Sequence, residues 1–369
     1  MRFRQWRHVM DMKMPRISFV FIALVVIFFL FQAARAGDTA DEHPKIVRRT
    51  AWHHVVRVDL FTLETKGTAG DYTFTGIMPL PRSNGYQDVR RLEHSDGAET
   101  MKYLETDWEY LAMKKRVPAR TLNPQPPTSE MHHVFEVVLY DLAADFRNIR
   151  GDIPQNTKRY PHTRYAGSYP PYIEPENKDI GRMAQSIKEE NNLREGDQLG
   201  FARAAFRHVV DNFGLVQQKT NNGLSRLSYV LRQREGNHCD LVSVYVSLLR
   251  RYGIPARHLV AMRLDGTPHT LAEFYLEESG WIPVDVVMQM LDRDKKADYF
   301  GLMRASNGIV IVGCDLGLTV SPPGEKAEKV PLLQRFMRWP EHLNPDLDDE
   351  CFRFGPLKEE RRDGPVMMM

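Results

Sequence analysis

The stretch GNHCDLVSVYVSLLRRYGIPAR, residues 236–257, holds the main clue to the fold. Its alternation of Val with Ser and Tyr is a strand pattern, but its ending is typical of a helix. Basic residues would fill the last helical turn, Gly253 would follow the helix, and Pro255 lies just beyond. The segment 239–252 is also long for a strand. We therefore expect a helix that is buried on most of its surface.

Cys239 would lie in the first turn of this helix, between His238 and Asp240. Unpaired N–H groups and the helix dipole stabilise a thiolate there, so we expect a lowered pKa for Cys239 and a backbone N–H that can serve an oxyanion. A buried thiol, half of a disulfide, a metal ligand and a nucleophile are the alternatives. Three consecutive helical residues fit one metal ion poorly. His238 is therefore interpreted as a solvated loop residue or as a residue at the rim of the cleft, and Asp240 as a helix-start residue.

A nucleophilic cysteine needs a base and a group that orients the base. The downstream stretch DGTPHTLAEFYLEESGWIPVD, residues 265–285, offers His269 on one predicted strand and Asp285 on the next. Adjacent antiparallel strands can place an imidazole and a carboxylate side by side. Cys239, His269 and Asp285 are therefore the predicted catalytic residues.

The first 36 residues have the layout of a secretory signal peptide. Basic residues precede the apolar run 17–31, and Ala-Arg-Ala at 34–36 is a typical cleavage pattern. The apolar run is short for a membrane span, although an uncleaved segment would act as an anchor. We therefore expect an exported protein, periplasmic or secreted, or one anchored by residues 17–31.

Charge gives no sign of nucleic-acid binding. The chain holds 50 basic and 48 acidic residues, and removing the six basic and one acidic residues of 1–36 leaves 44 and 47. The three cysteines cannot all pair with one another. A bond between Cys314 and Cys351 would leave Cys239 as the free thiol.

The rest of the chain predicts an α+β order. Strand patterns at 53–63, 71–81 and 131–142 suggest a β-sandwich-like domain. Helical patterns at 179–191, 196–214 and 225–236 follow, and then strands at 256–264, 270–278, 280–287 and 308–314. The predicted division is a signal peptide at 1–36, a linker at 37–50, a β domain at 51–150, a Pro- and Tyr-rich connector at 151–177, a catalytic domain at 178–322 and a C-terminal extension at 323–369.

These motifs resemble the transglutaminase-like superfamily, and in particular exported bacterial members with an N-terminal β domain. The resemblance rests on the cysteine motif at 236–240, GIPAR at 253–257, His269 and GWIPVD at 280–285. It implies a papain-like core with Cys239 as nucleophile, His269 as general base and acid, and Asp285 as its orienting residue. Weaker similarity extends over most of residues 50–320.

The chain departs from the family pattern at two places. Two residues separate Gly236 from Cys239 where one is usual, and His269 is followed by Thr270 and Leu271 where Ala and Trp are usual. The first would alter the loop before the nucleophile, and the second removes an aromatic ring beside the histidine.

The resemblance implies acyl transfer through a thioester, with a peptide or protein amide as substrate and with no metal or organic cofactor. Hydrolysis by a peptidase or amidase is the favoured interpretation. A cross-linking transglutaminase and a non-catalytic binding or assembly protein with the same fold are the alternatives.

Overall fold

The computed structural model describes residues 46–61, 72–117, 129–146, 163–216, 224–277, 279–292, 297–334, 337–339 and 352–363. All of them belong to one compact unit, His43–Met369. The predicted signal peptide lies outside the described residues. None of the helices that the structure describes is long and apolar enough to cross a membrane.

The N-terminal part of this unit is built from strands. They are β1 (Ile46–Phe61), β2 (Tyr72–Leu80), β3 (Gln87–His94), β4 (Glu99–Lys102), β5 (Glu109–Val117) and β6 (Ser129–Ala144). Three of the six were predicted, whereas β3, β4 and β5 were not. The strand-rich character expected for this region is confirmed.

Helices follow and then strands, in the predicted α+β order. The helices are α2 (Lys178–Glu190), α3 (Gln198–Asn212), α4 (Leu227–Gln233), α5 (His238–Arg251) and α6 (Val286–Leu291). The strands of the central sheet are β9 (Ala256–Arg263), β10 (Pro268–Leu276), β11 (Gly280–Val284) and β13 (Ile309–Cys314). Shorter strands are β7 (Gly214–Leu215), β8 (Glu235–Gly236), β12 (Leu302–Met303), β14 (Leu318–Val320) and β15 (Glu328–Val330), and the 3-10 turns are η3 (Thr163–Ala166) and η4 (Ala305–Asn307).

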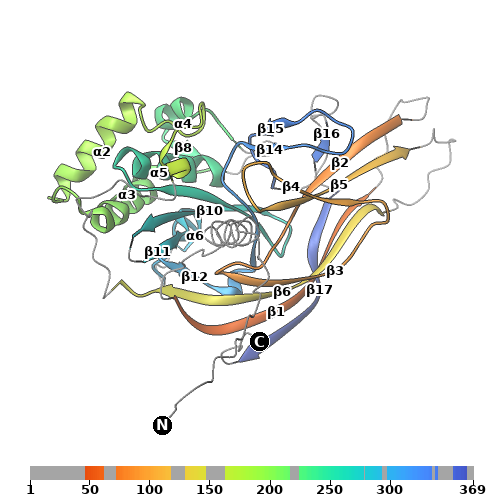
Figure 1. Cartoon of the computed structure of the whole chain (residues 1–369). Coiled ribbons are helices and arrows are strands. Elements are labelled where there is room, and N and C mark those ends of the chain that lie inside the picture. The colour runs from red at the N-terminus through yellow and green to blue at the C-terminus, as the bar shows by residue number, and fades with distance from the viewer. Residues whose placement is uncertain are drawn as a thin grey trace, which may run out of the picture. The chain divides into compact units, whose positions relative to one another are not determined.

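The central sheet has the order β11-β10-β9-β13 and is antiparallel throughout. Helix α5 packs on β10 and β9, and α2, α3 and α4 pack around α5 (Figure 1). Helix α5 is buried over most of its length, as predicted. This is the helix-on-sheet arrangement expected of a transglutaminase-like core.

The C-terminal stretch contributes strands to the N-terminal sheets. Strand β17 (Phe352–Asp363) pairs with β1, and β16 (Met337–Trp339) pairs with β2 (Figure 1). Strand β1 also begins inside the range 37–50 that was assigned to a linker. The domain boundaries remain predictions. Strand pairing nevertheless joins the predicted C-terminal extension to the predicted β domain.

Two apolar cores join the N-terminal strands to the central sheet. On one face, Leu259, Ala261 and Leu271 pack in one cluster with Ile77 and Tyr110. In the other cluster, Val260 and Met262 of β9 pack with Phe135 and Val137 of β6. N-terminal strands therefore pack against both faces of β9, and α5 packs on the same sheet.

The end of α5 has the geometry that its sequence predicts. Tyr252 is the C-cap, and Gly253 follows with a φ of +84°. The N–H of Ile254 donates to the carbonyl of Leu249 at 2.9 Å, and the N–H of Gly253 donates to that of Arg250 at 3.1 Å. These two bonds form a Schellman motif, which needs a residue that tolerates the left-handed region.

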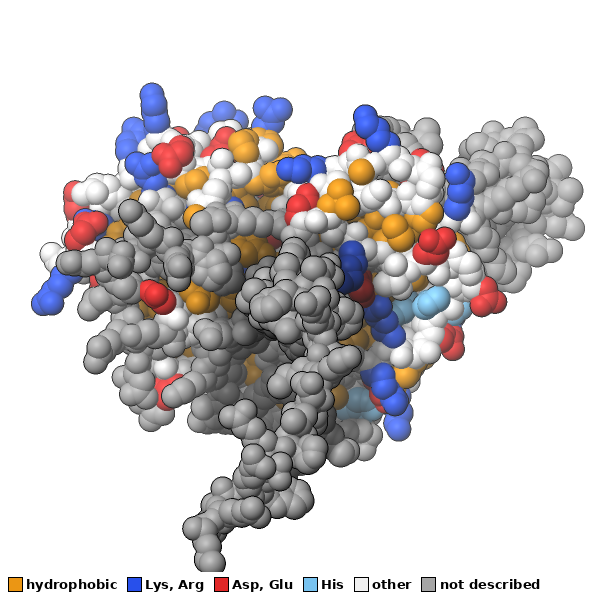
Figure 2. Space-filling model, viewed as in Figure 1, with side chains coloured by type: hydrophobic (Ala, Val, Ile, Leu, Met, Phe, Trp, Pro, Cys, Tyr) orange, Lys and Arg blue, Asp and Glu red, His pale blue; other side chains and the backbone are white. Residues whose placement is uncertain are grey.

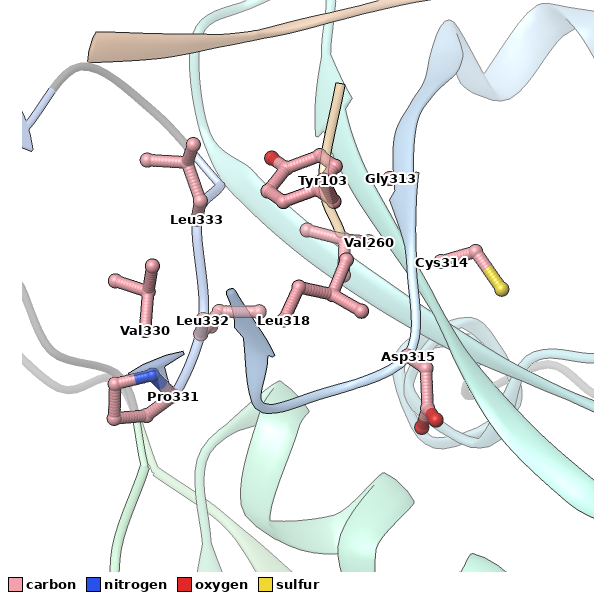
Figure 3. Close-up of a pocket in the computed structure, with 10 residues that line it drawn as sticks. All are labelled: Tyr103, Val260, Gly313, Cys314, Asp315, Leu318, Val330, Pro331, Leu332 and Leu333. Carbon is pink, nitrogen blue, oxygen red and sulfur yellow. The ribbon is translucent and has the colours of Figure 1, made fainter. Parts of the chain in front are cut away.

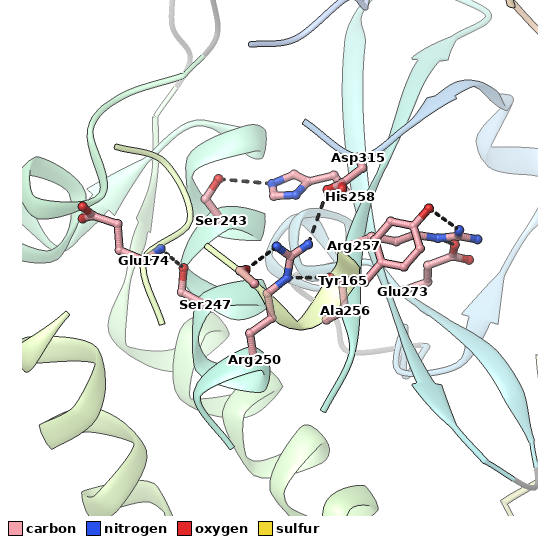
Figure 4. Close-up of polar contacts among 11 residues, drawn as sticks. Tyr165, Glu174, Ser243, Ser247, Arg250, Ala256, Arg257, His258, Glu273 and Asp315 are labelled. Carbon is pink, nitrogen blue, oxygen red and sulfur yellow. Dashed lines mark hydrogen bonds and ion pairs between the residues drawn. The ribbon is translucent and has the colours of Figure 1, made fainter. Parts of the chain in front are cut away.

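Arg250 of α5 ties the connector to the central sheet. Its guanidinium donates to the carbonyls of Ala256 at 2.8 Å and Gly167 at 2.7 Å, and pairs with Asp315 at 3.4 Å (Figure 4). Because the buried guanidinium of Arg250 is hydrogen-bonded to all three, it holds the start of β9 and the connector against α5.

A buried ion pair links the N-terminal strands to β10. Glu273 is fully buried, pairs with Arg257 and accepts a hydrogen bond from the hydroxyl of Tyr86. The Arg257 guanidinium also lies 4.0 Å from the ring centroid of Trp281, which is fully buried. The charge of each group is therefore compensated away from water.

We expect Glu273→Ala to lower the free energy of unfolding by about 3–5 kcal/mol, because it leaves the Arg257 guanidinium buried without its carboxylate. Tyr86→Phe removes only one hydroxyl and should cost about 1 kcal/mol. Urea unfolding measures both. A loss below about 1 kcal/mol in Glu273→Ala would show that the pair contributes little.

Two buried histidines make stability depend on pH. Burial lowers the pKa of His133 and that of His258 to about 3 each. His258 lies beside Ser243 of α5 (Figure 4), and its Nε2 is 3.1 Å from the Ser243 hydroxyl. Below pH about 6.5 the unfolded chain takes up protons at these positions while the folded chain does not, so the free energy of unfolding falls until pH reaches about 3.

Each histidine should therefore lower the free energy of unfolding by about 1.4 kcal/mol per pH unit between pH 6 and 4. Comparing wild type with His133→Leu by urea unfolding across this range isolates one of them. In His133→Leu the free energy of unfolding should fall less steeply with decreasing pH, by about 1.4 kcal/mol per pH unit. Equal slopes in the two proteins would contradict the lowered pKa of His133.

The described surface mixes charges of both signs. Figure 2 shows Lys and Arg side chains interspersed with Asp and Glu on the visible face. This agrees with the near balance of charges in the sequence.

Candidate active site

Cys239 lies at the start of α5, as predicted. Asn237 is the N-cap, and its side-chain oxygen accepts from the backbone N–H of Cys239 at 2.8 Å and of Asp240 at 3.0 Å. The Asp240 carboxylate in turn accepts from the N–H of Asn237 at 3.2 Å, which completes a capping box. The interpretation of Asp240 as a helix-start residue is confirmed.

This cap corrects the prediction for the oxyanion donor. The N–H of Cys239 is already bonded to the Asn237 side chain, so it does not point into open space. Gly236 is required by the same turn, because a Cβ there would lie 2.6 Å from the Cβ of Asp240. The loop before the cysteine is thus closed tightly on the first turn of the helix.

The sulfur of Cys239 contacts two side chains. It lies 3.0 Å from the hydroxyl oxygen of Thr270 and 3.1 Å from Nδ1 of His238. These two atoms are themselves 3.1 Å apart, so the three groups form a closed triangle. Cys239 is a free thiol with none of its surface exposed.

The alternation of β10 explains why Thr270 meets the sulfur. Ala272 and Phe274 share the face of Thr270 and pack in the same apolar cluster as residues of α5. Leu271 points to the opposite face, where it packs with Leu259 and Ala261. His269 has the parity of Leu271, so a regular strand directs it away from the face that α5 covers.

His269 and Asp285 form the predicted pair. Nε2 of His269 lies 2.7 Å from a carboxylate oxygen of Asp285, and both side chains are buried. The other carboxylate oxygen of Asp285 accepts from the N–H of Met288 at 2.8 Å and caps α6. Asp285 is therefore fixed by the helix start, and it fixes the histidine ring through Nε2.

The structure does not bring Cys239 into hydrogen-bonding contact with His269. Among the described residues, the hydrogen bonds of the sulfur go to His238 and Thr270 alone. The rings of His238 and His269 are stacked with centroids 6.5 Å apart, so the cysteine cluster and the His269–Asp285 pair are neighbours. The His269–Asp285 pair is formed, but Cys239 is not bonded to it in this arrangement.

Burial reverses the predicted effect on the thiol. Burial raises the pKa of Cys239 to about 12, against a smaller lowering by the Thr270 hydrogen bond. The prediction of a lowered pKa from the helix start alone is wrong for this arrangement, because the N–H groups are capped and the sulfur is removed from water. Burial and the neighbouring His269 lower the pKa of His238 to about 3, so that ring is neutral at pH 7.

The sequence did not identify three partners of Cys239: Asn237 at its backbone N–H, and His238 and Thr270 at its sulfur. Asn237 with Asp240 three residues later is a readable capping-box pattern. His238 and Thr270 stand at the two departures from the family motif, so the departures themselves pointed to them. His238 was interpreted as a loop residue, whereas its ring lies against the sulfur.

The other predicted features have mixed outcomes. Cys351 lies outside the described residues, so its pairing with Cys314 stays a prediction. Within the described ranges, no group of three or more His, Cys, Asp and Glu side chains is arranged to hold a metal ion. A small pocket borders β13 and the β14–β15 hairpin, and Figure 3 shows the Cys314 sulfur turned away from its apolar lining. None of the predicted catalytic residues lines this pocket.

Comparison with known proteins gives a family and a fold. Residues 185–286 match the model of the transglutaminase-like superfamily. This range contains the cysteine cluster and the His269–Asp285 pair. The search of curated proteins found no match.

Solved structures resemble the chain at low sequence identity. A candidate cysteine protease from Cytophaga hutchinsonii has 13% identity and a TM-score of 0.51, covering 84% of this chain and 99% of its own. The periplasmic domain of TgpA from Pseudomonas aeruginosa has 14% identity and a TM-score of 0.33, covering 66% and 90%. The first of these supports a shared fold across most of the chain.

The helix-on-sheet core, the cysteine at the start of its buried helix and the family match at 185–286 agree with one another. Residues 185–286 therefore form a transglutaminase-like domain.

Proposed function

We propose that the protein is a cysteine-dependent acyl-transfer enzyme that hydrolyses amide bonds in peptides or proteins. The observation that carries the proposal is the buried hydrogen bond between His269 and Asp285, beside a cysteine at the start of a buried helix. A carboxylate on Nε2 leaves Nδ1 as the ring nitrogen that can accept a proton.

In the proposed reaction the first turn of α5 and the start of β10 rearrange, so that the Cys239 sulfur leaves its contacts with Thr270 and His238 and reaches His269. Nδ1 of His269 takes the thiol proton, and the sulfur attacks the carbonyl carbon of the amide. The proton then passes to the leaving amine as the C–N bond breaks, which leaves a thioester. Water attacks the thioester with His269 again as base, which releases the acid and restores the thiol.

Asp285 has two functions in this scheme. Its carboxylate keeps the His269 proton on Nε2 and stabilises the imidazolium that forms in each half-reaction. Its cap on α6 holds the carboxylate in place during both steps. His269 is thus the proposed base and is already oriented by Asp285, while the proposed nucleophile must move.

Export is part of the proposal and rests on the sequence of residues 1–36. Basic residues, an apolar run and the Ala-Arg-Ala pattern give the segment the layout of a signal peptide. The proposed substrates are therefore peptides or proteins outside the cytoplasm. A membrane is a partner only if the segment remains attached.

One observation favours a second candidate, a non-catalytic binding or assembly protein. The Cys239 sulfur is fully buried, and burial raises its pKa to about 12. A thiol held in this state at all times would not act as a nucleophile. The two candidates differ in whether the sulfur ever leaves the cluster.

Profiling on peptide and amide libraries tests the proposal, with and without an added primary amine. Hydrolysis predicts free carboxylic acids as the main products in both conditions, and their absence in Cys239→Ala. Products joined to the amine would indicate a transglutaminase instead. Binding of library members with no product from wild type would favour the non-catalytic protein.

A further inference from the structure

Two side chains converge at the Cys239 sulfur, and both stand where the chain departs from its family pattern. His238 occupies the extra position between Gly236 and the cysteine, and Thr270 follows His269 where a smaller residue is usual. The two departures lie 32 residues apart in sequence, yet Nδ1 and Oγ1 are 3.1 Å apart. Both reach the same sulfur.

The geometry of the triangle satisfies the sulfur in either ionisation state. A neutral thiol can donate to Nδ1 of His238 or to the Thr270 oxygen. A thiolate can accept from the Thr270 hydroxyl, which keeps its own proton and turns it toward the sulfur. The proton lost from sulfur goes to the proposed base, and neither His238 nor Thr270 has to change its own charge.

We infer that Thr270 and His238 are positioning residues that hold the Cys239 sulfur at rest and set how readily it ionises. Thr270 has the larger part, because its hydroxyl can donate to the thiolate from a fully buried position. His238 is half-buried, and its ring covers the sulfur from the loop side. The inference deepens the proposed function, since it assigns the surroundings of the proposed nucleophile.

The pKa shifts agree with this geometry. The Thr270 hydrogen bond lowers the pKa of Cys239 and so offsets part of the increase that burial causes. Without the Thr270 hydroxyl, less would offset the increase in the pKa of Cys239 that burial causes. The thiol would then ionise less readily at any pH below its pKa.

Alkylation of the full chain by iodoacetamide tests the inference without a substrate. Mass spectrometry of the tryptic peptide 235–250 reports Cys239 separately from the other two cysteines. Wild type is compared with Thr270→Val, which keeps the branched shape, and with Thr270→Ser, which keeps the hydroxyl. Hydrogen exchange of the same peptide checks how often the start of the helix opens.

With opening taken into account, Thr270→Val should alkylate about tenfold more slowly at pH 8, and its pH profile between 7 and 9 should be displaced by about one pH unit. Thr270→Ser should lie within about twofold of wild type. A Thr270→Val chain that alkylates as fast as wild type overturns the role of the hydroxyl.

His238 gives a second pair of variants at a less buried position. His238→Asn keeps a polar group near the place of Nδ1, whereas His238→Ala removes it. We expect the pH profile of Cys239 alkylation to be displaced from that of wild type in His238→Ala, and to match that of wild type in His238→Asn. Identical profiles in the two would remove His238 from the inference.

The result is independent of turnover. If Cys239→Ala retained amide hydrolysis, the proposed function would fail while the alkylation profiles still reported the cluster. If the profiles were unaffected and turnover required Cys239, the proposed function would stand and the positioning role would fail.

Discussion

Cys239→Ala should lose amide hydrolysis by a factor on the order of 10⁴–10⁶ in kcat, because it removes the atom that forms the thioester. The structural cost should be small: alanine fits the space, and the Asn237 cap bonds to the backbone rather than to the sulfur. Steady-state kinetics with the substrate found by library profiling measures the loss, and thermal unfolding checks the fold.

Cys314→Ala is the matched control for loss of a thiol. Cys314 is also buried, but it lies at the end of β13 and belongs to neither the cysteine cluster nor the His269–Asp285 pair. Its activity should stay within a few-fold of wild type. Equal losses in the two variants would mean that the effect on Cys239 is one of folding and not of chemistry.

Asp285→Asn should lower kcat by about 10⁴ while leaving stability nearly unchanged. The amide oxygen can still accept from the N–H of Met288 and cap α6, since Asn is as good an N-cap as Asp. Its NH₂ group then faces Nε2 of His269 and donates to it. The ring proton is forced to Nδ1, and the histidine can no longer accept a proton from the thiol.

Asp285→Ala separates the two functions of this residue. It removes the cap as well as the carboxylate, so it should lower the free energy of unfolding by about 1 kcal/mol more than Asp285→Asn does. Kinetics and urea unfolding of the two variants give the comparison. Activity of Asp285→Asn within tenfold of wild type would show that the carboxylate does not orient the base.

Local patterns in the sequence predicted α2 to α5 and the central sheet, but not α6, whose first two residues were assigned to the predicted strand at 280–287. The end of α5 is fixed by Gly253, which tolerates the left-handed region, and by Pro255, which cannot continue a helix. Strands β16 and β17 were not predicted, because their partners β2 and β1 lie more than 200 residues away. Strand β5 was not predicted either, since its sequence EYLAMKKRV carries too many charges for a clear strand pattern.

The sequence predicted which residues lie at the site better than it predicted which side chains contact one another there. The pairing of His269 with Asp285 follows from two adjacent antiparallel strands and was predicted. The partners of the Cys239 sulfur depend on which face of β10 each side chain takes and on a loop one residue longer than usual. Because the burial of the sulfur arises from both, the raised pKa of Cys239 could not be predicted from the helix start alone.

Acylation of the protein by p-nitrophenyl acetate tests the central claim most directly, because it needs no natural substrate. After an acid quench, we expect an acetyl group on peptide 235–250 that hydroxylamine removes. Its formation should be slower by about 10²–10⁴ in His269→Ala, since that histidine takes the thiol proton. Acetylation of Cys239 at the same rate in wild type and His269→Ala, or its absence in wild type, would contradict the account.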